Sequence, residues 1–282
     1  MTEPDRTPHP EASPEAGHEQ GHEPSRAPLR VAVLGAAGRM GATTCAAVEA
    51  AGDLELVARV TRDDDVATAV RDAGAQVAVD FTVPGATEAN VHALLDAGVH
   101  AVVGATGWTD ASRARVAEHL AQVSAGRPDD AGLGVVIAPN FGLSAVLAMR
   151  FAAQAARYFE SAEIVELHHP DKVDAPSGTA RHTAAAIAAA RAEAGLGPVP
   201  DATTSGHEAR GADVDGVRVH AVRLRGLVAH EEVLLGNPGE QLVIRQDSFD
   251  RVSFMPGVLL AVRSVVSRPG LTVGLEHLLD LG

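Results

Sequence analysis

The first half of the chain alternates short apolar segments with segments of helical periodicity, and this order restricts the fold. The expected strands are Leu29–Leu34, Leu54–Val60, Val77–Phe81, Ala101–Gly104 and Val135–Ala138. Helical patterns follow Gly41 and occupy 85–97 and 110–123. Strands that alternate with helices in this way predict βαβ units and a parallel sheet, as in an α/β protein.

A glycine-rich turn joins the first expected strand to an Ala-rich helix that runs to about Ala51. It reads Gly35-Ala36-Ala37-Gly38-Arg39-Met40-Gly41. Strand, glycine turn and helix are the context of a dinucleotide-binding motif, in which the helix N-terminus binds the pyrophosphate. The spacing is G-x-x-G-x-x-G instead of the commoner G-x-G-x-x-G. The alternative is a strand–helix turn that uses glycines only for its geometry.

The end of the second strand should indicate which nicotinamide cofactor is bound. An acid there suits the ribose of NADH, whereas basic residues suit the 2′-phosphate of NADPH. The strand ends with Arg59, Val60, Thr61 and Arg62, and Arg39 is available from the glycine turn. We therefore expect both cofactors to be used, with NADPH bound more tightly. The acidic run 63–65 follows directly and remains able to reach a ribose.

The pattern changes after about residue 160, which predicts a second domain. The expected elements are a strand at Glu163–His168, a helix at 179–194, and alternating strands at Val217–Leu224, Glu231–Leu235 and Gln241–Gln246. They indicate a mostly antiparallel open sheet with a helix on part of one face. Met255–Ser267 is again helical in pattern. The expected organisation is a tail at 1–28, a Rossmann-like dinucleotide-binding domain at 29–158 completed by 252–282, and an α+β substrate-binding and oligomerisation domain at 159–251.

Composition excludes several classes of protein. The net charge is −14 and no run is rich in Lys or Arg, so a nucleic-acid partner is not expected. No apolar run reaches the roughly 18–20 residues of a membrane span. Residues 1–28 contain almost no large apolar side chain, which predicts disorder. We therefore expect a cytoplasmic protein without a membrane segment or a functional metal site.

The segment from Glu166 to Thr179 carries the most chemistry. It reads Glu-Leu-His-His-Pro-Asp-Lys-Val-Asp-Ala-Pro-Ser-Gly-Thr. His168 and Lys172 form a candidate proton-transfer pair, because histidine titrates near neutral pH and a nearby lysine can be shifted towards it. The free N–H groups of Ser177, Gly178 and Thr179 open a helix and favour a carboxylate or phosphate. A small anionic substrate that undergoes proton transfer is the first hypothesis.

Ordinary structural roles are the alternative for several of these residues. His168 and His169 can be strand-end residues, and Lys172 can be a solvated loop lysine. His220 and His230 lie in alternating strands and are interpreted as interface or surface residues.

Taken together, the motifs resemble those of the dihydrodipicolinate reductases of bacterial lysine biosynthesis, also described as 4-hydroxy-tetrahydrodipicolinate reductases. The resemblance runs from about Leu29 to the C-terminus. It rests on four segments, 33–41, 102–107, 137–141 and 166–179, and on the closing 247–257, which is similar to the actinobacterial branch. The family usually has Gly-Thr-Thr-Gly where this chain has Gly104-Ala-Thr-Gly107, so one hydroxyl is missing.

The resemblance implies NAD(P)H-dependent reduction of a dicarboxylate by a homotetramer. It implies that the cofactor is bound by Gly35, Ala36, Ala37, Gly38, Arg39 and Met40, by Gly104, Ala105 and Thr106, and by Ala138, Pro139, Asn140 and Phe141. It implies that His168 is the general acid/base, that Lys172 donates a proton, and that the substrate is bound by His169, Ser177, Gly178, Thr179 and Thr106. Arg59 and Arg62 are added from the charge argument alone.

Two other functions remain as hypotheses. One is another nicotinamide dehydrogenase of related architecture, such as an aspartate or homoserine dehydrogenase. The other is a non-catalytic NADPH-binding sensor that kept the fold. The His-His-x-x-Lys pattern argues against the first, and the presence of both His168 and Lys172 argues against the second.

Overall fold

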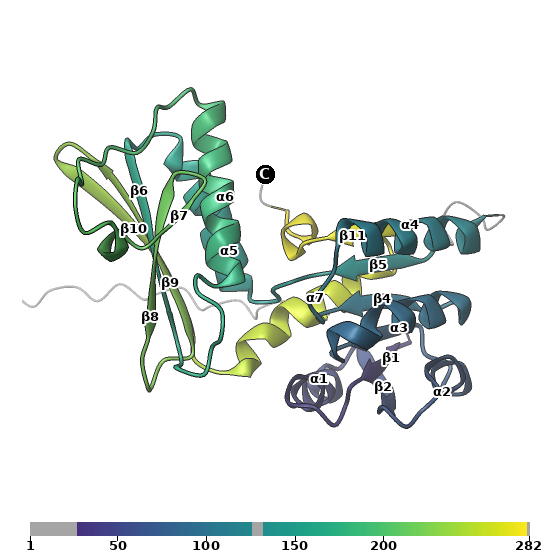
Figure 1. Cartoon of the computed structure of the whole chain (residues 1–282). Helices are drawn as coiled ribbons and strands as arrows, with labels where there is room; N and C mark the ends of the chain where they lie inside the picture. The colour runs from purple at the N-terminus through teal and green to yellow at the C-terminus, as the bar shows by residue number, and fades with distance from the viewer. Residues whose placement is uncertain (1–26, 126–131, 281–282) are drawn as a thin grey trace, which may run out of the picture.

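The computed structural model describes residues 27–125 and 132–280, which form two lobes joined side by side (Figure 1). Most of the segment expected to be a disordered tail therefore lies outside the described residues. Within the described ranges, no helix is both long and apolar enough to cross a membrane.

The first lobe is built on a parallel sheet with strand order β11-β5-β4-β3-β1-β2. Its strands are β1 (Leu29–Leu34), β2 (Leu54–Val60), β3 (Val77–Asp80), β4 (His100–Val103), β5 (Gly134–Ile137) and β11 (Gly270–Val273). Its helices are α1 (Arg39–Ala50), α2 (Val66–Asp72), α3 (Pro84–Asp96), α4 (Asp110–Ser124) and α7 (Met255–Val265). Every residue of β3 and of β5 is buried, as expected for parallel strands covered on both faces.

Two separate apolar clusters explain how this sheet is covered. On one face Val31, Val79 and Val102 pack with Val48 of α1 and Val262 of α7. The opposite face packs against apolar side chains of α2, α3 and α4. Figure 1 shows the same three layers. The prediction of a parallel Rossmann-like sheet from strand–helix alternation is confirmed.

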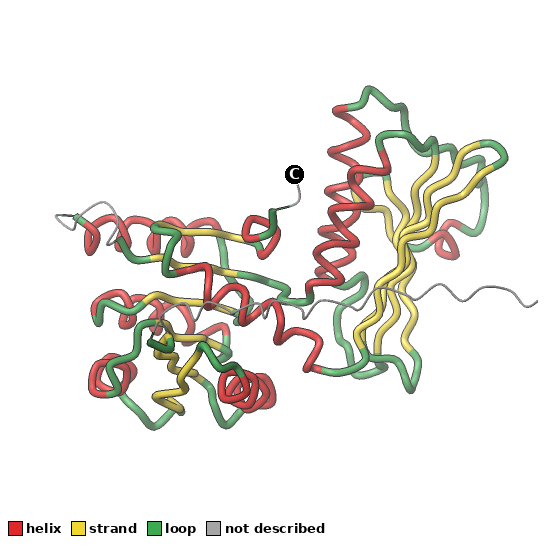
Figure 2. Tube along the Cα trace, turned by 180° about the vertical axis from the view of Figure 1, so that it is seen from behind, coloured by secondary structure: helices red, strands yellow, loops and turns green. Residues whose placement is uncertain are grey.

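The second lobe is a mixed sheet with strand order β10-β9-β6-β8-β7. The strands are β6 (Ser161–His168), β7 (Ala212–Val214), β8 (Val217–Arg223), β9 (Ala229–Asn237) and β10 (Glu240–Ser248). Only the β6–β8 pair is parallel, so the expected mostly antiparallel sheet is confirmed. Helices α5 (Leu143–Ala156) and α6 (Gly178–Glu193) lie together along one face of it (Figure 2).

Helix α5 was not among the expected elements. Its sequence is apolar around most of its surface, so it lacks the polar stripe that marks a surface helix. Ala152 and Ala156 of α5 pack with Ile164 of β6 and Ile187 of α6 in the core of the second lobe. The structure thus places α5 with the second sheet, before the expected domain boundary at 158. The chain returns to the first lobe through α7 and β11, which pairs in parallel with β5.

Candidate functional site

Two neighbouring cavities lie where the lobes meet, with volumes of about 280 Å³ and about 640 Å³. Both are lined by Pro139 and Asn140 after β5, by His168 at the end of β6, and by Ser177 and Thr179 at the start of α6. The smaller cavity also reaches Met40, Phe81, Gly104 and Phe141 of the first lobe. The larger one reaches Thr106, Lys172 and Gly178. The structure therefore brings together residues from both sequence motifs.

The glycine turn has the geometry that a dinucleotide site needs. Gly35 has a φ of +75°, and a Cβ there would lie 2.8 Å from the carbonyl oxygen of Phe81. A Cβ on Gly41 would lie 2.1 Å from the carbonyl oxygen of Gly35. Neither position accepts a side chain, because backbone atoms already occupy the space that a Cβ would need. The glycines are thus required by the close approach of helix, strand and turn.

The N-terminus of α1 is open towards solvent. Gly38 is the N-cap and offers no side chain to the first-turn amides, and Ala37, Gly38 and Arg39 are exposed. Amides in the first turn of a helix lack intrahelical partners and attract anions. Ala36 is buried, and Met40 lines the smaller cavity. This end of the helix fits a pyrophosphate group.

The charged residues at the end of β2 and just after it differ from one another in their partners. Arg59 forms an ion pair with Glu49 of α1, and Arg62, whose side chain is 94% exposed, forms a longer one with Asp63 at 3.8 Å. Asp64 accepts hydrogen bonds from the backbone N–H and hydroxyl of Thr61, at 2.7 and 2.8 Å. Asp65 caps α2 by accepting from the N–H of Thr68. All three acids of the run 63–65 therefore have local partners.

An apolar wall separates the glycine turn from the second lobe. Phe81 and Phe141 pack edge to face with their ring centroids 5.8 Å apart, and both line the smaller cavity with Gly104. Ala105 and Ala138 are buried and are absent from the lining of both cavities. These apolar groups offer a nonpolar surface against which a nicotinamide ring can pack.

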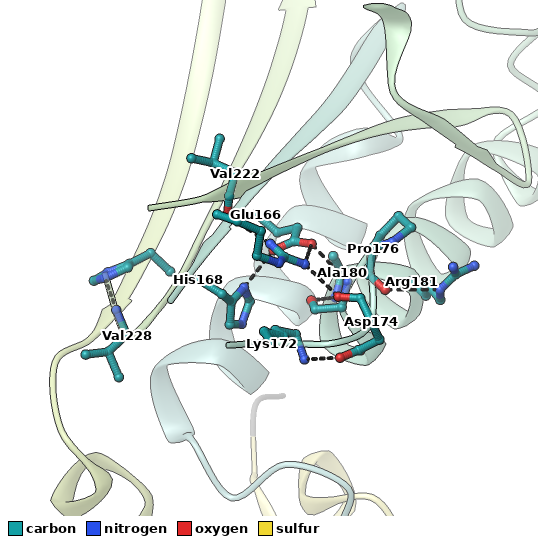
Figure 3. Close-up of polar contacts among 12 residues, drawn as sticks. Glu166, His168, Lys172, Asp174, Pro176, Ala180, Arg181, Val222 and Val228 are labelled. Atoms are coloured by element: carbon teal, nitrogen blue, oxygen red, sulfur yellow. Dashed lines mark hydrogen bonds and ion pairs between the residues drawn. The ribbon is translucent and has the colours of Figure 1, made fainter. Parts of the chain in front are cut away.

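Glu166 is the centre of the hydrogen-bond network in the second lobe (Figure 3). It has no solvent exposure and binds both terminal nitrogens of Arg223 at 2.7 Å. Its Oε2 lies 2.6 Å from Nδ1 of His168, and its Oε1 accepts the backbone N–H of Ser177 at 3.1 Å. One carboxylate thus fixes the histidine, the arginine and the start of α6.

The same contacts determine the protonation states of Glu166 and His168. Burial works against ionisation of Glu166, but the hydrogen bonds from Arg223 and His168 outweigh it and lower its pKa. Burial also lowers the pKa of His168, and the hydrogen bond to Glu166 opposes that shift. An ionised Glu166 accepts the Nδ1 proton of His168, so the Nε2 of the neutral ring is the nitrogen left for a ligand.

Lys172 and His169 occupy different positions beside this network. Nζ of Lys172 lies 2.7 Å from Oδ1 of Asp174, and both residues line the larger cavity (Figure 3). His169 is exposed and is absent from the lining of both cavities. The structure therefore brings Lys172 to the site, whereas it does not bring His169 there.

Ser177 caps α6, and some of its hydrogen-bonding groups are already occupied. Its N–H is bound to Glu166, and its Oγ accepts the N–H of Ala180 at 3.1 Å. The hydroxyl proton of Ser177 and the first-turn amides of Gly178 and Thr179 remain for an anion. A Cβ on Gly178 would meet nothing within 4 Å, so this end of α6 has room for a ligand.

Sequence reasoning gave no role to Arg223 or Glu231 and misplaced His230. His230 is 4% exposed, its Nδ1 lies 2.6 Å from Asp247, and its Nε2 accepts the N–H of Val228. It is buried, so its interpretation as an interface or surface residue is wrong. A signal for Glu166 was available: it alternates with Ala162 and Ile164 and therefore faces the core.

Family models match nearly the whole described chain. The model for the N-terminus of dihydrodipicolinate reductase matches residues 29–141, and the model for its C-terminus matches residues 144–279.

Individual relatives agree with these matches. The 4-hydroxy-tetrahydrodipicolinate reductase of Beutenbergia cavernae is 67% identical over 254 residues, covering 90% of this chain and 99% of the relative. That of Streptomyces griseus is 61% identical over 254 residues, covering 90% and 98%. The dipicolinate-bound dihydrodipicolinate reductase of Paenisporosarcina sp. TG-14 superposes with a TM-score of 0.77 at 33% identity, covering 89% of this chain and all of that structure.

Proposed function

This chain belongs to the dihydrodipicolinate reductase family, and we propose that His168, Lys172 and the start of α6 carry out its reaction. The chain is an oxidoreductase of lysine and diaminopimelate biosynthesis that reduces 4-hydroxy-tetrahydrodipicolinate, and it uses a nicotinamide cofactor. The observation that supports the residue roles is the shared cavity wall, in which His168 lies beside both the glycine turn and α6. The product of this reduction is tetrahydrodipicolinate.

The substrate is a dicarboxylate, and the site offers separate donors for it. The amides of Gly178 and Thr179 and the hydroxyl of Ser177 receive one carboxylate at the N-terminus of α6. Thr106 and Lys172 line the same larger cavity and receive the other. The relative from Paenisporosarcina binds dipicolinate, a planar dicarboxylate, which supports this choice of ligand class.

Hydride addition to the electron-poor ring leaves negative charge that a proton must neutralise. The bound nicotinamide supplies the hydride. Lys172 exchanges its ion pair with Asp174 for the substrate and places an ammonium group beside the developing charge. The Lys172 ammonium supplies this proton, and Nε2 of the neutral His168 accepts it and passes it to the substrate while Glu166 holds Nδ1, so the imidazole keeps one orientation throughout.

A coupled assay tests the proposed function. Purified protein is supplied with pyruvate, aspartate semialdehyde and a dihydrodipicolinate synthase, and the loss of NADPH absorbance is followed. We expect synthase-dependent oxidation of NADPH. Cofactor binding without oxidation would support the sensor hypothesis instead.

Arg39 and Arg62 are expected to favour NADPH over NADH. Guanidinium groups match phosphate oxygens, and these two arginines are exposed near the glycine turn. Changing both to Ala should raise the KM for NADPH by roughly tenfold or more and leave that for NADH nearly unchanged, as steady-state kinetics will show. Arg59→Ala is the matched comparison, because Glu49 already binds that guanidinium. Equal effects on both cofactors would remove these arginines from recognition of the 2′ position.

A homotetramer is expected from the second sheet. Helices α5 and α6 cover one of its faces, and the opposite face carries partly buried Val165, Leu167 and Leu234 in the described chain (Figure 1). Apolar positions on an open sheet face are buried by self-association through a symmetric patch. Light scattering at micromolar concentration should give four times the chain mass. A monomer would contradict this expectation.

A further inference from the structure

Glu231 is a second buried acid in the site, directly across the sheet from the first. In the β6–β9 register its partner is Glu166, so the two side chains share the face covered by α5 and α6. Glu231 is 3% exposed and lines the smaller cavity together with His168, Ser177 and Thr179. No role in the reaction described above uses it.

Glu231 and Glu166 differ in their partners. Glu166 has an arginine, a histidine and a backbone N–H as partners. Among the described residues, Glu231 has one hydrogen-bond partner, the hydroxyl of Thr183 at 2.8 Å from its Oε1. Its Oε2 is buried and has no hydrogen-bond partner among the described residues. A buried carboxylate without a cation or several donors is costly, and such a group is more stable when it carries a proton.

The two contacts of the Thr183 hydroxyl are compatible with a protonated Glu231. Oγ1 of Thr183 lies 3.1 Å from the carbonyl oxygen of Thr179 as well as 2.8 Å from Glu231. A hydroxyl group has one proton, and a carbonyl oxygen only accepts. Both contacts are hydrogen bonds at the same time if Glu231 supplies the proton of the shorter one. When Glu231 ionises, this hydroxyl donates to the carboxylate instead, and that hydrogen bond opposes the raised pKa of Glu231.

The charged groups around Glu231 do not neutralise it. On β6 it faces Glu166 and His168, on β8 Arg223 is bound to Glu166, and on α6 its contact is the neutral Thr183. The cavity positions on β10 are the neutral Gln246 and Ser248. His230 on the same strand is bound to Asp247.

The direction of the titration follows from these surroundings. Burial raises the pKa of Glu231 to about 7, the hydrogen bond with Thr183 opposes this, and the negative charge of Glu166 adds to it. A second negative charge placed in the cavity raises that pKa further.

We propose that Glu231 is a neutral carboxylic acid in the wall of the smaller cavity, beside the Ser177 and Thr179 that also line the substrate cavity, and that the enzyme must hold this proton in order to bind its dicarboxylate substrate. The inference rests on the proposed function, because it needs a dianionic ligand. An ionised Glu231, which is itself buried, would face that ligand with like charge. Dicarboxylate affinity therefore depends on the protonation of one residue outside the His-His-x-x-Lys motif.

Calorimetric binding of dipicolinate to the enzyme with reduced cofactor tests the proposal. For the unmodified protein, affinity should fall roughly tenfold per pH unit once the pH exceeds the pKa of Glu231. Repeating the titration in buffers of different ionisation enthalpy should show proton uptake on binding near neutral pH. In Glu231→Gln, which keeps the shape and stays neutral, this part of the pH dependence and of the proton uptake should be lost.

Two further variants keep the test decisive. Glu232→Gln makes the same change one residue along β9, where the side chain faces the other side and pairs with Arg245, and it should behave like the unmodified protein. Thr183→Val removes the hydroxyl that donates to Glu231 once this acid ionises. The loss of dipicolinate affinity should therefore move to higher pH in this variant. The Thr183→Val measurement tests the proposal even if Glu231→Gln fails to fold. Identical pH dependence in the unmodified, Glu231→Gln and Thr183→Val proteins overturns the proposal. Absence of dipicolinate binding together with absence of coupled turnover overturns the proposed function instead.

Discussion

Replacing His168 by Gln should lower kcat by roughly 10²–10⁴-fold, the range expected for loss of a general acid/base. His168 lines both cavities and is held through Nδ1 by a fully buried carboxylate. The melting temperature should change little, because the ring lies at the end of β6, outside the apolar cluster of the second lobe. Steady-state kinetics in the coupled assay and thermal unfolding measure the two effects.

His169→Gln is the matched comparison, since it changes the neighbouring residue in the same way. His169 is exposed and outside both cavity linings, so its loss should leave both kcat and KM nearly unchanged. A His168→Gln variant that is well folded and retains full turnover would exclude His168 from proton transfer. Similar losses of kcat in both variants would indicate disturbance of the loop instead.

The sequence was sufficient for the arrangement of the first lobe, because its signals are local. From β1 to β4, each strand and the helix after it are neighbours in the chain, and the glycine turn from Gly35 to Gly41 is one continuous segment. Hydrophobic runs and turn residues record such structure directly. The segment from His168 to Thr179 was equally accessible, since one strand end, one loop and one helix start bring its residues together.

The rest of the site depends on contacts that no local pattern records. Arg223 reaches Glu166 across 57 residues, and Glu231 meets Glu166 through the register of β9 on β6. The strand containing Glu231 was expected to begin at that residue, yet it begins at Ala229. Strand register decides which face each side chain occupies, and it follows from tertiary packing. The buried acids were therefore visible in the sequence, but their pairing was not.

Removing the carboxylate of Glu166 should affect both stability and turnover. Glu166→Gln breaks the two-point contact with Arg223 and leaves that guanidinium, whose side chain is 20% exposed, without its counterion. Loss of one partner of a buried ion pair costs about 3–5 kcal/mol, and the partial exposure of Arg223 places the expected loss near the lower end. Since His168 also loses the acceptor that orients its ring, kcat should fall by roughly 10–100-fold.

The pH dependence of stability distinguishes this role from a packing role. The pKa of Glu166 is lowered in the folded protein, so its contribution to the free energy of unfolding is present above its unfolded pKa of about 4.5 and is lost as the pH falls through the folded value. The difference in unfolding free energy between the unmodified protein and Glu166→Gln should therefore shrink in acid. Denaturant unfolding at a series of pH values measures it. A difference that stays constant with pH would mean that the carboxylate acts by shape and not by charge.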